Sequence, residues 1–128
     1  MRWHVAYRPQ SYAMWAVEEK RSGRVIGMVN YHHRFTDQRR VDVGWLTLPS
    51  HQGKGLTAEA MRPVLKYLFD KIGVHKIEAL IMPANKPSQG LARKLGFRKE
   101  GGPIRDRWLR NGKWHSVLIY GLIAGEEK

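Results

Sequence analysis

The chain has 128 residues, with 23 lysines and arginines against 11 aspartates and glutamates, and no cysteine. This length fits a single domain, residues 1–128, and a hydrophobic content of 42% favours a folded chain over a disordered one. The absence of cysteine excludes disulfides, thiolate metal sites and a cysteine nucleophile. No apolar run approaches the roughly 20 residues of a membrane span, and the first residues lack the apolar core of a secretory signal, so we expect a soluble, cytoplasmic protein without a membrane partner.

The formal net charge of +12 attracts anions. Such a surface can bind a nucleic acid, a phosphorylated cofactor or an acidic protein. Alternatively, the charged side chains have no partner and only keep the surface solvated. Zinc-finger spacing, an aromatic RNP-like motif and a GXXG loop are all missing, so no motif indicates nucleic-acid binding. Charge alone does not choose among these alternatives.

The first half of the chain predicts three strands. The first covers residues 12–19 and ends in the turn 21–24, where Gly23 lies. The second covers residues 25–35, and the polar run 36–40 closes a hairpin onto the third strand, residues 41–48, which Pro49 ends.

From Gly55 the hydrophobic period changes to that of a helix. The apolar residues that form its face are Ala58, Met61, Val64, Leu65, Leu68, Phe69 and Ile72, and Gly73 ends it. Pro63 removes one backbone donor inside this pattern. Because the apolar stripe continues beyond the proline, we expect a kink and not a break.

The second half predicts a strand over residues 76–82 and a helix that Asn85 caps and Gly96 ends. Two further strands, residues 97–109 and 113–123, flank Asn111-Gly112, a strong hairpin signal. The order is therefore β-β-β-α-β-α-β-β. Antiparallel hairpins at both ends and a β-α-β crossover in the middle predict an α/β domain with a mixed sheet flanked by helices.

The segment from Leu48 to Glu59 joins a strand to a helix and contains the candidate binding loop, Gln52-Gly53-Lys54-Gly55. Its glycines let the backbone approach a ligand, and the first amides of a helix lack internal partners. Lys54 adds a cation. These features suit a pyrophosphate, although an ordinary glycine-containing loop is the alternative. The spacing excludes both a Walker A loop and the G-x-G-x-x-G dinucleotide fingerprint.

Two runs of residues resemble the signatures of GNAT-type N-acetyltransferases. The first is Val43-Gly44-Trp45 followed by Gln52-Gly53-Lys54-Gly55 and Glu59-Ala60. The second is Asn85-Lys86-Pro87-Ser88 followed by Lys94-Leu95-Gly96-Phe97 and Glu100-Gly101. The resemblance covers roughly residues 15–123 and is strongest to the branch that contains the ribosomal-protein N-terminal acetyltransferases. It implies a GNAT-like acyl-CoA N-acyltransferase fold that uses acetyl-CoA as acyl donor.

The same resemblance implies roles for residues of both runs. The backbone of Trp45, Leu46, Thr47 and Leu48 would pair with the pantetheine arm of acetyl-CoA. The pyrophosphate would lie at the amides that begin the first helix, those of Gln52, Gly53, Lys54, Gly55 and Leu56, with Thr57 next to them. Asn85 would form a hydrogen bond with the pantetheine, and Ser88 would lie near the thiol. The two central strands would splay apart to admit the cofactor.

The implied reaction is direct attack of a primary amine, a peptide N-terminus or a small molecule, on the thioester. It needs a base for the amine proton and a donor for the departing thiolate. We expect Asp42 to be the base, with an ion pair to Arg39 or Arg40 as its structural alternative. Ser88 is the expected thiol-side donor, or alternatively only a helix cap. Asp106 is a further candidate.

Two departures from the family pattern bear on catalysis. Many relatives place a tyrosine at the position of Ala92 as the thiolate's proton donor, so that role passes here to Ser88, to water or to no group at all. The family usually carries a strand and one or two helices ahead of residue 15, where this chain offers only residues 1–14. The amine site is therefore expected to be unusually open, completed by a second copy in a homodimer, or lost.

No metal is expected, because His32 and His33 are adjacent on a strand and should point to opposite faces, and the other histidines show no ligand spacing. The five tryptophans are expected to pack the sheet. Three functions follow: an acetyl-CoA-dependent N-acetyltransferase, a non-catalytic acyl-CoA-binding module, and a basic protein associated with RNA or the ribosome.

Overall fold

The computed structural model describes residues 2–5 and 12–128. The elements in chain order are β1 (Arg2–Val5), β2 (Ala13–Glu18), β3 (Val25–Phe35), β4 (Arg40–Thr47), α1 (Leu56–Tyr67), β5 (Lys76–Ile81), α2 (Lys86–Leu95), β6 (Arg98–Arg110) and β7 (Lys113–Ile123). They match the predicted order with one addition, since no strand was expected where β1 lies. None of the helices described is long and apolar enough to cross a membrane.

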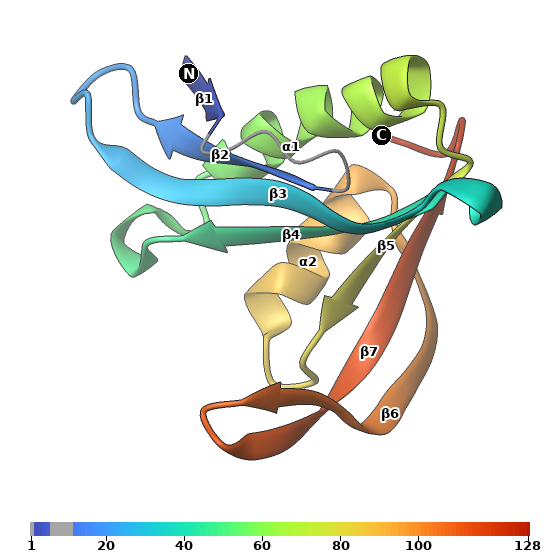
Figure 1. Cartoon of the computed structure of the whole chain (residues 1–128). Helices are drawn as coiled ribbons and strands as arrows, with labels where there is room; N and C mark the ends of the chain where they lie inside the picture. The colour runs from blue at the N-terminus through green and yellow to red at the C-terminus, as the bar shows by residue number, and fades with distance from the viewer. Residues whose placement is uncertain (1, 6–11) are drawn as a thin grey trace.

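The strands form one seven-stranded sheet with the order β1-β2-β3-β4-β5-β7-β6 (Figure 1). Only the central pair, β4 and β5, is parallel, because α1 crosses over between them, and the other pairs are antiparallel. The predicted mixed sheet and GNAT-like fold are therefore confirmed.

Local signals in the sequence determine several element ends. Asn111 and Gly112 have φ angles of 51° and 72°, the left-handed pair that a tight type I′ hairpin needs. The side chain of Asn85 accepts a hydrogen bond from the amide of Ser88 and so caps α2 as expected. Helix α1 continues through Pro63 without a break and ends in a π-helical turn, Leu68–Ile72.

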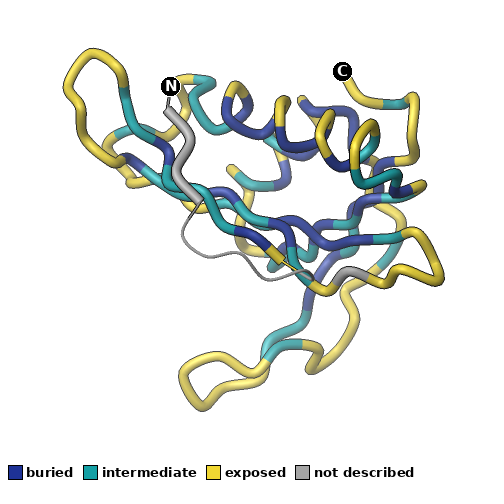
Figure 2. The backbone as a smooth tube through the Cα atoms, turned by 45° about the horizontal axis from the view of Figure 1, so that its top comes forward, coloured by how far each residue is buried: buried dark blue, intermediate teal, exposed yellow. Residues whose placement is uncertain are grey.

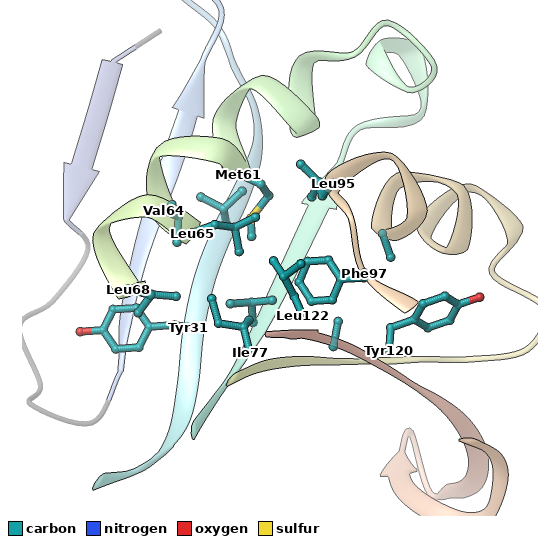
Figure 3. Packing of buried hydrophobic residues seen from close by; sticks show 14 of the residues in the cluster. Tyr31, Met61, Val64, Leu65, Leu68, Ile77, Leu95, Phe97, Tyr120 and Leu122 are labelled. Atoms are coloured by element: carbon teal, nitrogen blue, oxygen red, sulfur yellow. The ribbon is translucent and has the colours of Figure 1, made fainter. Parts of the chain in front are cut away.

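Both helices pack on the same face of the sheet and share one hydrophobic cluster with it (Figure 3). Alternate residues of the strands point into this cluster, for example Ile77, Ala79 and Ile81 of β5, because side chains alternate between the two faces of a sheet. The opposite face carries both polar side chains, such as Arg40 and Glu78, and apolar ones, such as Leu46, and no helix of the described residues covers it. Figure 2 shows that the end of the β6–β7 hairpin projects from the body and is exposed.

Candidate functional site

The parallel strands β4 and β5 separate partway along their length. Their pairing ends where Asp42 lies opposite Glu78, whereas β4 stays paired with β3 as far as Thr47. The second half of β4 therefore has a free edge on the side of β5. This opening is the slot that the family resemblance implies.

Two hollows meet at this slot and share Trp45, Leu46, Asn85 and Ser88. The first, which we call the loop-side hollow, has a volume of about 310 Å³ and lies between β4, the loop after it and α2. The second, the hairpin-side hollow, has a volume of about 360 Å³ and lies between β3, β4, the end of β5 and the β6–β7 hairpin. The slot can therefore be reached from two sides.

Most of the predicted cofactor residues line the loop-side hollow, and they are Trp45, Leu46, Thr47, Gln52, Gly53, Gly55, Leu56, Thr57, Asn85 and Ser88. Leu48 and Lys54 do not line it. Lys54 is exposed. A hydrogen bond from Ser22 is the main cause that lowers the pKa of the Glu19 carboxyl, and the charges of His51, Arg21 and Lys54 contribute less. The cation predicted for this loop thus does not line the loop-side hollow.

The loop contains unpaired backbone amides, and those of Gly53 and Gly55 belong to residues that line the hollow. The amides of Gly53, Lys54 and Gly55 donate to no acceptor in the described part of the chain, and Leu56 begins the helix, whose first bond runs from the Glu59 amide to the Gly55 carbonyl. The Gln52 amide is different, since it donates to the Pro49 carbonyl at 3.4 Å. The anion site predicted from the glycines stays a prediction, and of the amides named for it that of Gln52 already has an acceptor.

Lys94 supplies the cation that Lys54 does not. It lies on α2, lines the loop-side hollow, and its Nζ is 3.4 Å from the position that a Cβ on Gly55 would occupy. Gly55 has a φ of 76°, a left-handed conformation that glycine adopts without strain. Free amides, the N-terminus of α1 and an ammonium group thus face one hollow, an arrangement that fits a pyrophosphate.

The backbone of β4 offers fewer groups to the slot than expected. The Leu48 amide donates to the Ile26 carbonyl of β3. Because the backbone groups of successive residues in an antiparallel strand alternate between its two edges, Leu46 also pairs toward β3, and Trp45 and Thr47 face the slot. The Thr47 carbonyl already accepts a bond of 3.0 Å from the Gln52 side chain.

Ser88 lies where β4 and α2 come together. The indole nitrogen of Trp45 donates to its hydroxyl oxygen at 3.0 Å, so the hydroxyl proton remains available to another acceptor. Ala92, by contrast, is fully buried and lines neither hollow. A thiolate-side donor at Ser88 is therefore compatible with the geometry.

On the hairpin side, His32 and Asn30 line the hollow. The His32 Nδ1 and the Asn30 Oδ1 are 2.7 Å apart, so Nδ1 carries the proton and the lone pair lies on Nε2. Burial lowers the pKa of His32 below its ordinary value, and the neighbouring His33 lowers it further while Asp42 opposes the shift. His32 is thus a neutral base on the wall of the hollow at neutral pH.

Asp42 is buried behind this wall. It is 7% exposed, and its carboxylate lies 3.2 Å from His33 Nδ1 instead of pairing with Arg39 or Arg40. It lines neither hollow, and Asp106 does not line them either.

The prediction that His32 and His33 point to opposite faces is wrong. His33 has a φ of 49° where the β3–β4 register shifts, and the two rings pack edge to face with their centroids 4.7 Å apart. Potential ligand atoms of His32, His33 and Asp42 consequently lie within 4.8 Å of one another. The argument against a metal therefore fails, and its absence stays a prediction.

Sequence reasoning missed several groups that line the hollows, among them Asn30 and His32 of β3, Lys94 of α2, and Trp108 and Arg110 of β6. Lys94 carries a usable signal, since Asn85, Ser88, Leu91 and Lys94 follow at steps of three and so share a helix face. No sequence pattern indicates Trp108 and Arg110, because they line the hairpin-side hollow only as a result of the bend in the long β6–β7 hairpin.

The comparisons with known proteins agree with this geometry. The family model described as an acetyltransferase (GNAT) domain matches residues 1–98. The uncharacterized N-acetyltransferase YoaA of Bacillus subtilis is 27% identical over 121 residues, which cover 94% of this chain and 68% of the relative. The alanine N-acetyltransferase of ribosomal protein uS5 from Escherichia coli is 39% identical over 73 residues, which cover 57% of this chain and 37% of the relative.

Two solved structures show the same fold. A putative ribosomal-protein-serine acetyltransferase from Vibrio cholerae superposes with a TM-score of 0.81 at 23% identity, covering 88% of this chain and 64% of that one. A dodecameric spermidine N-acetyltransferase from the same organism superposes with a TM-score of 0.75 at 24% identity. The match covers 89% of this chain and 66% of that one. The chain thus spans between 37% and 68% of the length of these relatives.

Proposed function

Because the chain belongs to the GNAT acetyltransferase family, whose domain model matches residues 1–98, we propose that it transfers an acetyl group from acetyl-CoA to a primary amine. The observation that carries this proposal is the slot beside Trp45, which is open to one hollow on the loop side and to another on the hairpin side. A transferase of this kind needs such a passage, because donor and acceptor must meet at one carbonyl carbon.

The loop-side hollow is the proposed acetyl-CoA site. The free amides of Gly53, Lys54 and Gly55 and the ammonium of Lys94 bind the pyrophosphate. The backbone edge at Trp45 and Thr47 then guides the pantetheine arm through the slot toward Ser88. Because Gly55 has no Cβ, its backbone and the Lys94 ammonium approach each other closely, so that both can contact the same phosphate.

When bound, acetyl-CoA supplies an acetyl thioester whose carbonyl carbon an amine attacks directly. The protein has two proton transfers to manage, one from the attacking amine and one to the departing sulfur. Ser88 serves the second, because its hydroxyl accepts from Trp45 and keeps its own proton free to donate.

His32 serves the first transfer in this proposal. Its Nε2 lone pair lies on a ring that lines the acceptor side, and its lowered pKa keeps the ring neutral. Asp42, the base expected from the sequence, is buried against His33 and acts on the amine only through this pair or through water. We therefore assign Asp42 a positioning role.

Two measurements on the purified protein test the proposal. Acetyl-CoA at millimolar concentration should raise the melting temperature, because a ligand that binds only the folded state stabilises it. Thiol release in the presence of a panel of amines should then detect transfer. No thermal shift contradicts acetyl-CoA binding, and a shift without thiol release for any amine indicates a non-catalytic binding module.

A second copy that completes the acceptor side stays a prediction. The hairpin-side hollow is open in a single chain, and the spermidine enzyme from Vibrio cholerae that shares the fold is dodecameric. Sedimentation of the protein with and without acetyl-CoA measures whether copies associate.

A further inference from the structure

The hairpin-side hollow has an unusual charge for a site that binds an amine. Arg110 is the fully charged side chain on its wall, and no carboxylate of the described residues lines it. A polycationic amine such as spermidine needs carboxylates to hold its remaining ammonium groups, since desolvating them next to a guanidinium is unfavourable. The wall therefore disfavours an acceptor with several positive charges.

The carboxylates on the neighbouring strands do not change this balance. Asp42 lies 3.2 Å from His33, Glu78 lies 3.3 Å from Arg40, and Glu100 lies 2.6 Å from Lys76. Glu78 and Glu100 are thus each paired with a cationic side chain, while Asp42 is buried beside His33 and does not line the hollow.

The positive charge continues outward along the projecting hairpin. Arg105, Arg107, Arg110 and Lys113 are all exposed there, against the single carboxylate of Asp106. Arg110 stacks on Trp108, with its guanidinium carbon 5.0 Å from the ring centroid, and this contact holds the charge against the hollow wall. These exposed cations of the hairpin, of which Arg110 lines the hollow, are complementary to anionic groups attached to the amine.

We infer that the acceptor is an acidic peptide N-terminus, whose amine enters the hairpin-side hollow beside His32 while its following carboxylates lie along Arg110 and the cations of the hairpin. This inference rests on the proposed acetyl transfer. Its binding chemistry is the charge-assisted hydrogen bond between guanidinium and carboxylate, which Arg makes with two parallel N–H groups. Because these pairs are exposed, they raise the association rate and are weakened by salt.

The test compares two peptides of equal length that share an N-terminal alanine, one continuing with aspartate and glutamate and the other with lysine. Spermidine and free aspartate are further acceptors. We expect kcat/KM to be at least tenfold higher for the acidic peptide than for the lysine peptide and for spermidine, and this preference to shrink as the salt concentration rises. Equal or reversed preference overturns the inference, and so does free aspartate reacting as well as the acidic peptide.

The variant R110E should abolish or reverse the preference, and R110Q should reduce it. K20E is the matched control, because Lys20 is exposed in the β2–β3 turn and the substitution makes the same change in net charge. The acetyl-CoA thermal shift should be unchanged in all three, since Arg110 lies outside the loop-side hollow. A preference that survives R110E overturns the inference.

Failure of the proposed acetyl transfer gives a result that differs from failure of the acidic-peptide inference. If no acceptor releases thiol, acetyl transfer itself is contradicted. If transfer occurs without acidic preference, and single-stranded RNA inhibits it through Arg110, the hairpin binds RNA and the peptide assignment is wrong.

Discussion

Trp45 on β4 donates a hydrogen bond of 3.0 Å to the hydroxyl of Ser88 on α2, across the slot where the central strands separate. The two residues are 43 positions apart in the sequence. Their contact brings the free edge of β4 to the first turn of α2 and orients the hydroxyl. It also places an indole ring between the loop-side and hairpin-side hollows, which both include Trp45.

Removing the hydroxyl should slow the chemistry and spare acetyl-CoA binding. We expect Ser88→Ala to lower kcat by about ten- to a hundredfold, because the departing sulfur loses its donor, with little change in the KM for acetyl-CoA. Ser88→Thr retains the hydroxyl and should recover most of the rate. Trp45→Phe keeps Ser88 but removes the orienting N–H, so an intermediate rate is expected. Steady-state kinetics measure all three, and an unchanged kcat in Ser88→Ala would remove Ser88 from the mechanism.

Lys94, and not Lys54, should contribute to cofactor affinity. An exposed ion pair is worth up to about 1 kcal/mol, so Lys94→Gln is expected to weaken acetyl-CoA binding about fivefold. Lys54→Gln makes the same change of charge outside the loop-side hollow and should leave the affinity unchanged. Titration calorimetry measures both. Pantetheine, which lacks the pyrophosphate, should bind the two variants equally, and equal losses of acetyl-CoA affinity would contradict the placement of the phosphates.

The choice between His32 and Asp42 as the base is open to a direct test. We expect His32→Gln to lower kcat/KM for the amine by about a hundredfold, in the range of general-base catalysis, and to remove the acid limb of its pH profile. Asp42→Asn should cause a smaller loss, because the His32 ring and its bond to Asn30 remain. The reverse ranking, with Asp42→Asn the more damaging, would return the base to Asp42.

Local chemistry explains which parts of the fold and site could be predicted from the sequence. Gly53 and Gly55 identify the candidate binding loop because their left-handed φ angles of 77° and 76° are conformations that other residues rarely adopt. Asn85, Gly96 and the Asn111-Gly112 turn likewise define element ends through their own backbone preferences. Features of this kind need no knowledge of distant contacts.

The parts that could not be predicted depend on long-range packing or on strained backbone. His33 adopts a left-handed conformation although it is not a glycine. The regular alternation of side chains along a strand therefore predicts the wrong face of the sheet for its ring. The contact between that ring and the buried Asp42 could therefore not be predicted either. Arg110 joins the hollow only because β6 and β7 shift register repeatedly and bend.

The lowered pKa of His32 predicts a stability that depends on pH. Burial is the largest cause, and it penalises the protonated ring in the folded state only. The unfolded chain, with a histidine pKa of about 6.5, therefore binds more protons than the folded one in the window between the folded pKa and that value. Folding stability should rise with pH through this window, be fully present above it, and be lost as the pH falls through the folded pKa.

His32→Gln serves as the matched control, because glutamine keeps a polar side chain on β3 but does not titrate. We expect its melting temperature to change less than that of the unsubstituted protein between pH 5 and pH 7.5, since one of the groups that favour unfolding in acid is gone. Scanning calorimetry across this range measures the difference. Parallel curves for the two proteins would show that His32 titrates alike in the folded and unfolded chain, and the neutral ring proposed for the hairpin-side hollow would then lose its support.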